Sequence, residues 1–492
     1  MQTKFAKVLI ANRGEIALRI MRTLRRLGIE SVAVYHAVDA ATPFVAMADE
    51  CAEIFGETPT AAYLDVDQLI DVARRHGAAA VHPGYGFLAE NAAFADAVAA
   101  AGIRFIGPGS DVIRLLGDKI TARTFVGERG FPLAPSIGVD DDDWRAQLAA
   151  IGYPILIKAA AGGGGKGMHI VHSAGELDAA LASARSEGQR YFADARIYCE
   201  KYLSHPRHIE VQILADEHGH CVHLGERDCS VQRRFQKVIE ETPAPGLDPA
   251  LREEICTTAV AIATAAGYTN AGTVEFILGD GGEFYFLEMN TRLQVEHPVT
   301  EMVTGIDLVE AQLLIAAGEP LPFAQHDIQH RGHAIEMRIC AEDCDAGFIP
   351  ATGTIALLRD ASGAGVRIDS GLCPGMAITS AFDPMLAKLI VHAADRDAAI
   401  ARAADAAAMQ VILGVTTNLG FLQRVLRHPA FAAGEVHTHF IEQHAEALRR
   451  PAPAPDHADA IVAIAALNEP GFRRLVYDTP PLHAAIGAWR NT

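Results

Sequence analysis

Short apolar runs alternate with helically spaced apolar positions along the first part of the chain. Residues 7–11 (KVLIA) and 31–35 (SVAVY) are two such runs, and between them apolar residues recur four positions apart, as on one face of a helix. A strand, a helix and a strand in about thirty residues indicate a parallel unit. Residues 78–85 and 97–107 continue the pattern. We therefore predict an α/β domain with a parallel sheet layer over 1–117.

The middle of the chain shows strand patterns of the antiparallel kind. Residues 153–160 and 166–171 read as strands joined by a run of glycines. Residues 208–216 alternate polar and apolar positions, as a half-buried strand does. Residues 273–278 and 283–290 lie on either side of a GDGG turn, which is a hairpin signal. This region is therefore predicted to be α+β and largely antiparallel.

Helix caps and a change of character divide the rest of the chain. Asp118 is placed to cap a helix over 119–128, and Asp248 precedes a proline at the start of another helix. Short strands dominate after residue 332, which predicts a mostly antiparallel β domain over 331–447. The PAPAP sequence marks a linker, and we expect 448–492 to be this linker and the start of a following domain absent from the chain.

Composition limits the classes of partner and the compartment. Half of the 492 residues are apolar, and the net charge of −19 argues against nucleic acid or an anionic membrane as a partner. A local group of basic residues could still bind an anionic substrate. Eight scattered cysteines form no CxxC pair, and no apolar run reaches 18 residues. The sequence thus predicts a soluble, cytoplasmic protein.

Four consecutive glycines, Gly162 to Gly165, precede Lys166 and Gly167. The spacing of Gly162 and Gly167 fits a phosphate-binding P-loop, but Met168 follows where that motif needs Ser or Thr, and the next element is a strand. A P-loop is therefore excluded. On local grounds, a lid that folds over phosphates and a flexible linker remain equal alternatives.

A ladder of polar residues begins in the last strand of the hairpin and continues beyond it. Glu288, Asn290, Arg292, Gln294 and Glu296 occupy alternate positions, so an extended segment would direct all five side chains to one face. A solvated edge strand could also alternate, but it would not require the amide groups or the mixture of charge signs.

Oxygen ligands and basic residues gather around this ladder. Glu275, on the partner strand, joins Glu288 and Asn290 in a set suited to Mg²⁺, while Arg292 suits an anion. Basic residues expected nearby are Lys119, Lys158, Lys166, Arg233, Arg234, Lys237 and Arg338. A lid, a carboxylate pair and separated lysines together indicate phosphoryl transfer from a nucleotide.

The motifs then match a known family. The chain resembles biotin carboxylase, a member of the ATP-grasp superfamily, from residue 8 to about residue 445. The segments that carry the resemblance include LIANRGEIALRI, VHPGYGFLAEN, AAAGGGGKGM, RHIEVQI, GERDCSVQRR, EMNTRLQVEHPVTE and FDPMLAKLIV. The resemblance implies an ATP-grasp domain over 118–330, with a mobile glycine-rich lid subdomain at about 131–203.

The resemblance also implies a ligase reaction. ATP would activate bicarbonate as carboxyphosphate, and the carboxyl group would pass to N1′ of a biotin held on a carrier lysine outside this chain. This is the first half-reaction of an acyl-CoA carboxylase of the acetyl-, propionyl- or methylcrotonyl-CoA type. It further implies a homodimer, a carrier protein or domain, and a carboxyltransferase subunit.

Matching motif positions assign roles within the site. The residues implied to bind ATP are Lys119, Lys158, Gly163, Gly164, Gly165, Glu200, Lys201, Leu203, His208, Gln232, Glu275 and Glu288. Those implied to bind bicarbonate or biotin are Lys237, Arg292, Gln294, Val295, Glu296 and Arg338. Glu275, Glu288 and Asn290 would bind Mg²⁺ or Mn²⁺.

Among these residues, Glu296 is implied to be the base that deprotonates bicarbonate, and Arg338 to stabilise the biotin enolate. Lys237 and Arg292 complete the implied catalytic set. Phe235 departs from the histidine of many relatives, so a side-chain contact with the nucleotide is expected to be lost there.

Two other functions remain open at this stage. Another ATP-grasp ligase would share carboxyphosphate or acylphosphate chemistry, although QRRFQK and EMNTRLQVEH favour biotin. A non-catalytic scaffold is disfavoured, because the whole implied catalytic set is present.

The lid interpretation predicts a protease footprint. Without ATP, limited proteolysis is expected to cut near Gly162–Gly167, and bound ATP should suppress that cleavage because the closed loop is inaccessible. Gel and mass analysis of the fragments measures both states. Equal cleavage with and without ATP would favour the linker instead.

Overall fold

The structure is a computed structural model that describes residues 5–140, 142–160, 168–192, 194–451 and 464. The chain divides into one compact unit up to Leu448 and a second unit from Arg449. The predicted linker and following segment, 448–492, lie almost entirely outside the described residues, as does the glycine run.

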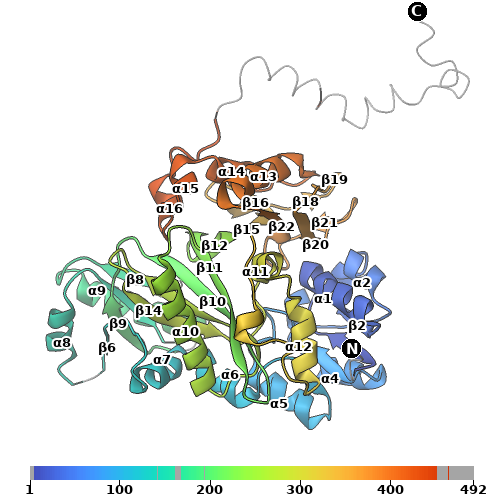
Figure 1. Cartoon of the computed structure of the whole chain (residues 1–492), viewed down its shortest axis with the longest axis horizontal. Helices are drawn as coiled ribbons and strands as arrows, with labels where there is room; N and C mark the ends of the chain where they lie inside the picture. The colour runs from blue at the N-terminus through green and yellow to red at the C-terminus, as the bar shows by residue number, and fades with distance from the viewer. Residues whose placement is uncertain (1–4, 141, 161–167, 193, 452–463, 465–492) are drawn as a thin grey trace, which may run out of the picture. The chain divides into compact units, whose positions relative to one another are not determined.

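The N-terminal region contains a five-stranded parallel sheet (Figure 1). Its order is β3-β2-β1-β4-β5, and the strands are β1 (Lys7–Ile10), β2 (Glu30–Tyr35), β3 (Glu50–Glu53), β4 (Ala80–His82) and β5 (Arg104–Phe105). The uninterrupted apolar run of β1 is explained by burial on both faces of the sheet. The predicted parallel layer is confirmed.

Helices cover this sheet, and polar side chains cap two of them. Asp65 and Asn91 cap α4 and α5 with their side chains. The helices are α1 (Gly14–Leu27), α2 (Pro43–Met47), α3 (Pro59–Tyr63), α4 (Val66–Arg75), α5 (Ala92–Ala100) and α6 (Ser110–Gly117), with a short 3₁₀ turn η1 (Ala37–Asp39).

The four-stranded sheet β6-β9-β7-β8 is antiparallel. Its strands are β6 (Ser136–Gly138), β7 (Ile155–Ala159), β8 (His169–Val171) and β9 (Ile197–Lys201). Its helices are α8 (Trp144–Ile151) and α9 (Leu177–Phe192). The prediction of two strands on either side of the glycine run is confirmed, and β7 and β8 pair directly.

An eight-stranded antiparallel sheet runs through the rest of the unit, in the order β14-β13-β10-β11-β12-β15-β22-β20. The strands are β10 (Arg207–Ala215), β11 (Cys221–Arg233), β12 (Gln236–Thr242), β13 (Asn270–Leu278), β14 (Phe284–Asn290), β15 (His333–Cys340), β20 (Val366–Ser370) and β22 (Met385–Ala393). The pairing of β12 with β15 joins strands from the two predicted domains 118–330 and 331–447 in one sheet. One continuous sheet therefore crosses the predicted boundary near residue 330, and the boundary itself stays a prediction.

Helices on this sheet come from both sides of that boundary. Helix α10 packs on β10 and β11, and α11 packs on β15 and β22 (Figure 1). The helices are α7 (Lys119–Glu128), α10 (Pro249–Ala265), α11 (His297–Thr304), α12 (Leu308–Ala316) and α13 (Arg396–Met409). Asp118 caps α7 as predicted, since its carboxylate accepts a hydrogen bond from the Thr121 N–H.

Small elements complete the C-terminal part. The short strands, paired two by two, are β16 (Glu342–Asp343) with β17 (Ile349–Pro350), β18 (Gly353–Thr354) with β21 (Ala377–Ile378), and β19 (Leu357–Arg359) with β23 (Val411–Leu413). The remaining helical turns are η2 (Gln325–Asp327), α14 (Leu419–Leu426), α15 (Pro429–Ala432) and α16 (Phe440–Gln443). All these strand pairs are antiparallel, as expected.

One local prediction was wrong. The polar ladder was expected to be extended through Glu296, but β14 ends at Asn290 and α11 begins at His297, with Glu296 at its N-cap position. The proline after His297 suits the first turn of a helix, so the chain turns within the ladder. Val295, which lies in this turning segment, lines a cavity.

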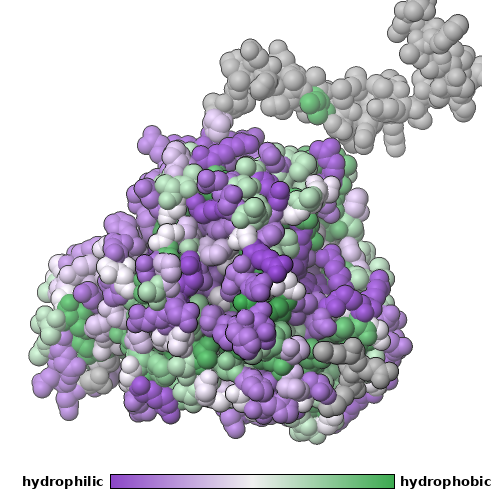
Figure 2. All heavy atoms as spheres, in the orientation of Figure 1, coloured by the Kyte–Doolittle hydropathy of each residue, from purple (hydrophilic) through white to green (hydrophobic). Residues whose placement is uncertain are grey.

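Polar side chains cover much of the face drawn in Figure 2, with apolar ones scattered among them. Among the helices in the described ranges, none combines the length and the apolar character needed to span a bilayer.

A buried ion pair links the N-terminal region to the eight-stranded sheet. Lys388 on β22 is fully buried, and its Nζ lies 3.3 Å from Glu15 on α1 and donates to the Val295 carbonyl at 3.0 Å. Burial raises the pKa of Glu15 to about 7, although Lys388 opposes the shift.

This pKa predicts a pH-dependent stability. Because the folded pKa of Glu15 lies above its unfolded value, its contribution is fully present below about pH 4.5 and is lost as pH rises through 7. Glu15→Gln should remove roughly 3 kcal/mol of that dependence. Urea unfolding of both proteins from pH 4.5 to pH 8 measures it. Parallel pH profiles would contradict the prediction.

Candidate active site

A cavity of about 1310 Å³ opens between the four-stranded and the eight-stranded sheets, with residues of the C-terminal part along one side. Most of the predicted site residues line it. They are Lys119, Lys158, Glu200, Lys201, Leu203, His208, Gln232, Lys237, Glu275, Glu288, Asn290, Arg292, Gln294, Val295 and Arg338. Glu296 lies fully buried behind the wall, while Gly163, Gly164 and Gly165 lie outside the described residues.

The Lys237 ammonium lies among three buried carboxylates. Its Nζ donates to Glu275 Oε1 at 2.8 Å, to Glu296 Oε1 at 2.6 Å and to Glu210 Oε2. Burial alone would lower the pKa of Lys237, but the three carboxylates raise it well above its ordinary value. The lysine is therefore charged, and it compensates carboxylates that would otherwise be costly to bury.

Glu296 is clamped between two cations. Besides Lys237, it accepts a hydrogen bond from Arg338 Nη2 at 2.8 Å. Burial would raise the pKa of Glu296, but Lys237, Arg338 and Arg227 together hold it well below the ordinary value. The carboxylate is therefore ionised at neutral pH.

Glu275 accepts hydrogen bonds from four side chains. Besides Lys237, Asn290 Nδ2 at 2.8 Å and Gln294 Nε2 at 3.0 Å donate to its Oε1. His208 Nε2 lies 2.8 Å from its Oε2. Burial would raise the pKa of Glu275, yet Lys237 and His208 lower it. The converse holds for His208, because burial would lower its pKa but Glu275 raises it.

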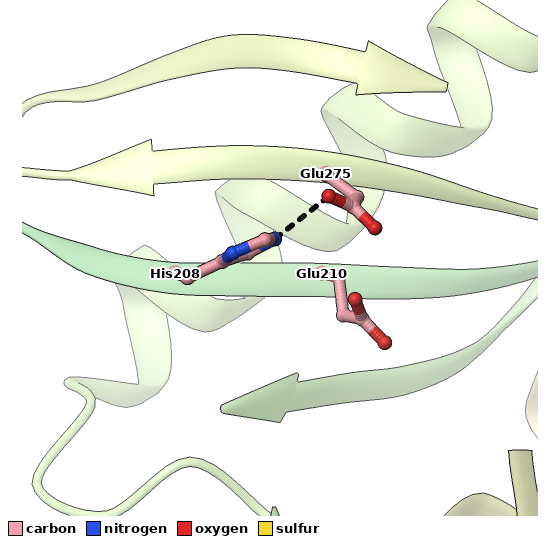
Figure 3. Close-up of side chains that lie close together, drawn as sticks. All are labelled: His208, Glu210 and Glu275. Atoms are coloured by element: carbon pink, nitrogen blue, oxygen red, sulfur yellow. Dashed lines mark hydrogen bonds and ion pairs between the residues drawn. The ribbon is translucent and has the colours of Figure 1, made fainter. Parts of the chain in front are cut away.

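Neighbouring strands supply these groups. Figure 3 shows His208 and Glu210 on one strand, β10, with Glu275 beside them on β13 and the contact from His208 drawn. Positions 208 and 210 share one face of β10 because side chains alternate along a strand. Glu275 and Glu288 are register partners of β13 and β14.

The predicted metal ligands are hard oxygen donors. Glu288 Oε2 contacts Lys119 Nζ at 2.9 Å, and Asn290 Oδ1 accepts from Arg292 Nη2 at 3.1 Å. Together with Glu275, they offer the oxygen ligands that Mg²⁺ prefers. A second possible ligand group, His208, Glu210 and Glu275, was not predicted. Lys237 already contacts both carboxylates of that group.

The other end of the cavity carries the remaining predicted nucleotide residues. Lys158 on β7 and Glu200 on β9 form a buried ion pair, and Arg123 Nη1 lies 3.4 Å from the same carboxylate. Phe235 lies at the turn between β11 and β12 with a φ of 65° and half its surface exposed. It borders the cavity, where it offers an apolar ring and no hydrogen bond.

Sequence reasoning missed four residues that hold these groups in place. Glu210 and Glu240 are fully buried partners of Lys237 and Arg338, with the Arg338 Nε to Glu240 Oε1 distance at 2.5 Å. Arg227 donates to Glu210, and Glu90 accepts from Arg292. The polar alternation of RHIEVQIL could have revealed Glu210, because it shares the face of His208.

Family models match almost the whole compact unit. Residues 4–113 match the biotin carboxylase N-terminal domain, and residues 336–443 match the biotin carboxylase C-terminal domain. Residues 118–324 match the ATP-binding domain of the carbamoyl-phosphate synthase L chain. The biotin carboxylase of Halalkalibacterium halodurans is 50% identical over 444 residues, covering 89% of this chain and 98% of the relative.

The chain belongs to the biotin carboxylase family. The biotin carboxylase of Allochromatium vinosum is 48% identical over 447 residues, covering 90% of this chain and 99% of the relative. The alpha chain of the mitochondrial methylcrotonoyl-CoA carboxylase of Dictyostelium discoideum is 48% identical over 466 residues, covering 94% of this chain and 67% of the relative. As a biotin carboxylase, the protein is an ATP-dependent ligase.

Solved biotin carboxylases share the fold. The biotin carboxylase domain dimer of Hydrogenobacter thermophilus 2-oxoglutarate carboxylase, in complex with MgADP, ADP and bicarbonate, matches with a TM-score of 0.88 and 42% identity. That match covers 92% of this chain and all of the other. A Campylobacter jejuni biotin carboxylase–β,γ-ATP complex matches with a TM-score of 0.87 and 41% identity, covering 90% of this chain and 99% of the other.

Removal of Arg227 is expected to destabilise the site. Arg227 is fully buried, and its Nε donates to Glu210 Oε1 at 2.5 Å. Arg227→Met would leave that oxygen buried without its cation, so we expect a loss of about 3–5 kcal/mol in the free energy of unfolding. Urea denaturation measures it. Arg145→Met, which breaks an exposed pair with Asp178, serves as the control and should change stability by less than about 1 kcal/mol. Similar small losses in both variants would contradict the prediction.

Proposed function

We propose that this biotin carboxylase transfers a carboxyl group from bicarbonate to N1′ of a carrier-bound biotin, with cleavage of ATP to ADP and phosphate. The observation that carries the proposal is Glu296, an ionised and fully buried carboxylate held directly behind the cavity wall between Lys237 and Arg338, which both line the cavity. A base flanked by two cations suits an anionic substrate that must lose a proton.

Glu296 is the proposed base for bicarbonate. A bicarbonate oxygen attacks the γ-phosphorus of ATP, the bond to ADP breaks, and the bicarbonate proton passes to Glu296. Lys237, Arg292 and Gln294, with the backbone of Val295, are the proposed bicarbonate contacts. When Lys237 and Arg338 share their charge with the bound anion, they hold Glu296 less strongly, and its basicity rises.

The second step forms the bond to biotin. The carboxyl group leaves the phosphate of carboxyphosphate and bonds to N1′, and the N1′ proton departs with that phosphate. Arg338 is the proposed partner for the negative charge that develops on the biotin ureido oxygen. Glu240 and Glu296 hold the Arg338 guanidinium in place, and a guanidinium that is already fixed stabilises developing charge without reorganisation.

ATP is proposed to lie along the cavity between the two sheets. Lys119, Lys158 and His208 supply positive charge for its phosphates. Glu200, Lys201, Leu203 and Gln232 are the proposed neighbours of the adenine, and Gly163, Gly164 and Gly165 would cover the phosphates. In the structure Glu200 pairs with Lys158, so nucleotide binding would have to redistribute that contact.

Glu275, Glu288 and Asn290 are the proposed ligands of Mg²⁺ or Mn²⁺. The fit rests on their oxygen donors, two of which come from register partners of adjacent strands. The ion would neutralise charge on the nucleotide phosphates and help to orient them.

Partners and location follow from the same proposal. The acceptor is biotin on the lysine of a carrier protein or domain, and a carboxyltransferase subunit would take the carboxyl group onward to an acyl-CoA. A homodimer is proposed because a related biotin carboxylase domain was solved as a dimer. A cytoplasmic location is proposed from the eight cysteines, none of which forms a disulfide in the described chain.

A second candidate is a carbamoyl-phosphate-type ligase. It is supported by the match of residues 118–324 to the ATP-binding domain of the carbamoyl-phosphate synthase L chain. Bicarbonate-dependent ATP cleavage, with and without free biotin, separates the two candidates. Stimulation by biotin and formation of carboxybiotin are expected. Bicarbonate-dependent cleavage that biotin leaves unchanged would support the second candidate.

Replacement of Glu296 tests its role as the base. Glu296→Gln preserves size but cannot accept the bicarbonate proton, so carboxybiotin formation should fall by about 10²–10⁴-fold. ATP binding, measured by calorimetry, should persist. Glu53→Gln alters an exposed carboxylate in the N-terminal region and should leave the rate unchanged. Undiminished carboxylation by the Glu296 variant would overturn the assignment.

A further inference from the structure

A turn of the N-terminal region reaches the active site. It follows β4, and Asn12 Nδ2 fixes it by donating to the carbonyls of Pro83 at 2.7 Å and Tyr85 at 2.8 Å. The side chain of Asn91 caps the next helix, α5. Glu90 therefore stands on backbone that is held on both sides, and its side chain extends toward the end of β14.

The Glu90 carboxylate joins backbone and side chain of the ladder. Its Oε1 accepts a hydrogen bond from the Thr291 N–H at 3.1 Å, and its Oε2 accepts from Arg292 Nε at 2.8 Å. The two contacts fix the carboxylate relative to the peptide that carries the guanidinium. Because a guanidinium is planar, a partner at Nε constrains the direction of the other two nitrogens.

The remaining nitrogens of Arg292 point along the ladder. Nη1 donates to Gln294 Oε1 at 2.9 Å and to the Leu293 carbonyl at 3.2 Å, and Nη2 donates to Asn290 Oδ1 at 3.1 Å. A guanidinium has five N–H donors. Four therefore have partners among the described residues, and one on Nη2 remains for a ligand in the cavity that Arg292 lines.

These contacts continue into the buried cluster. Asn290 and Gln294 both donate to Glu275 Oε1, which also accepts from Lys237, the lysine bound to Glu296. A chain of hydrogen bonds thus runs from the N-terminal region to the proposed base.

We propose that Glu90 is a positioning residue, which orients the Arg292 guanidinium for bicarbonate from the N-terminal region. The inference rests on the proposed role of Arg292 in binding bicarbonate. A charged carboxylate suits this role because hydrogen bonds between ionised groups are stronger and more directional than neutral ones. Glu90 itself need not touch the substrate.

Steady-state kinetics of Glu90→Gln test this role. The variant keeps an acceptor oxygen but loses the charge, so KM for bicarbonate should rise about tenfold. KM for ATP and the melting temperature should stay close to those of the unchanged protein. Glu90→Asp keeps the charge on a shorter side chain. Its KM for bicarbonate should lie between those of the unchanged protein and the Glu90→Gln variant. Glu57→Gln, an exposed change in the same region, should have no effect.

A double-mutant cycle separates this inference from the proposed function. In an Arg292→Ala background, Glu90→Gln should add nothing further to KM for bicarbonate, because the two residues act through one contact. If Arg292→Ala itself leaves that KM unchanged, the proposed function is wrong at Arg292. If Arg292→Ala raises it but Glu90→Gln does not, only the role of Glu90 is overturned. Equal rises in KM for bicarbonate and ATP, or a lowered melting temperature in both Glu90 variants, would also overturn it.

Discussion

The site depends on one ammonium group surrounded by carboxylates. Lys237 contacts Glu210, Glu275 and Glu296, none of which has more than slight exposure to water. Three buried anions close together would repel one another strongly in a medium of low dielectric, so the lysine is what allows them to coexist. Arg227 and Arg338 extend the same compensation to the outer oxygens of Glu210 and Glu296. The charge state of the proposed base is therefore a property of this cluster and not of Glu296 alone.

The eight-stranded sheet brings the cluster together. His208 and Glu210 come from β10, Glu275 from β13 and Lys237 from β12, while Arg338 comes from β15 in the C-terminal part. Residues more than a hundred positions apart thus share one surface because their strands pair in register. The part of the ladder beyond β14 adds side chains from a turning segment, and Glu90 anchors that segment from the turn between β4 and α5 in the N-terminal region.

Much of this arrangement could be predicted from local patterns. The parallel layer, the β7–β8 pair, the cap at Asp118 and the β13–β14 hairpin all follow from apolar spacing and turn residues, and the motif positions led to the residues that line the cavity. The failures have physical causes. The ladder has the alternation of a strand, but it leads into a proline at the start of α11, so the chain turns before Glu296. Glu210 could have been inferred from its place on the face of His208, whereas Glu240 and Arg227 have roles created by the pairing of separate strands, which a single sequence does not record. The pairing of β12 with β15 was missed for the same reason.

That pairing has a consequence for the exchange of parts between related proteins. A cut near residue 330 would separate β15, β22 and β20 from β12 and leave the peptide groups of both edges without partners. Such edges favour association with other chains over independent folding. The cut would also remove Arg338 from Glu296. The C-terminal part is therefore unsuited to transplantation as a module, and recombination would succeed more readily where no strand of this sheet is divided.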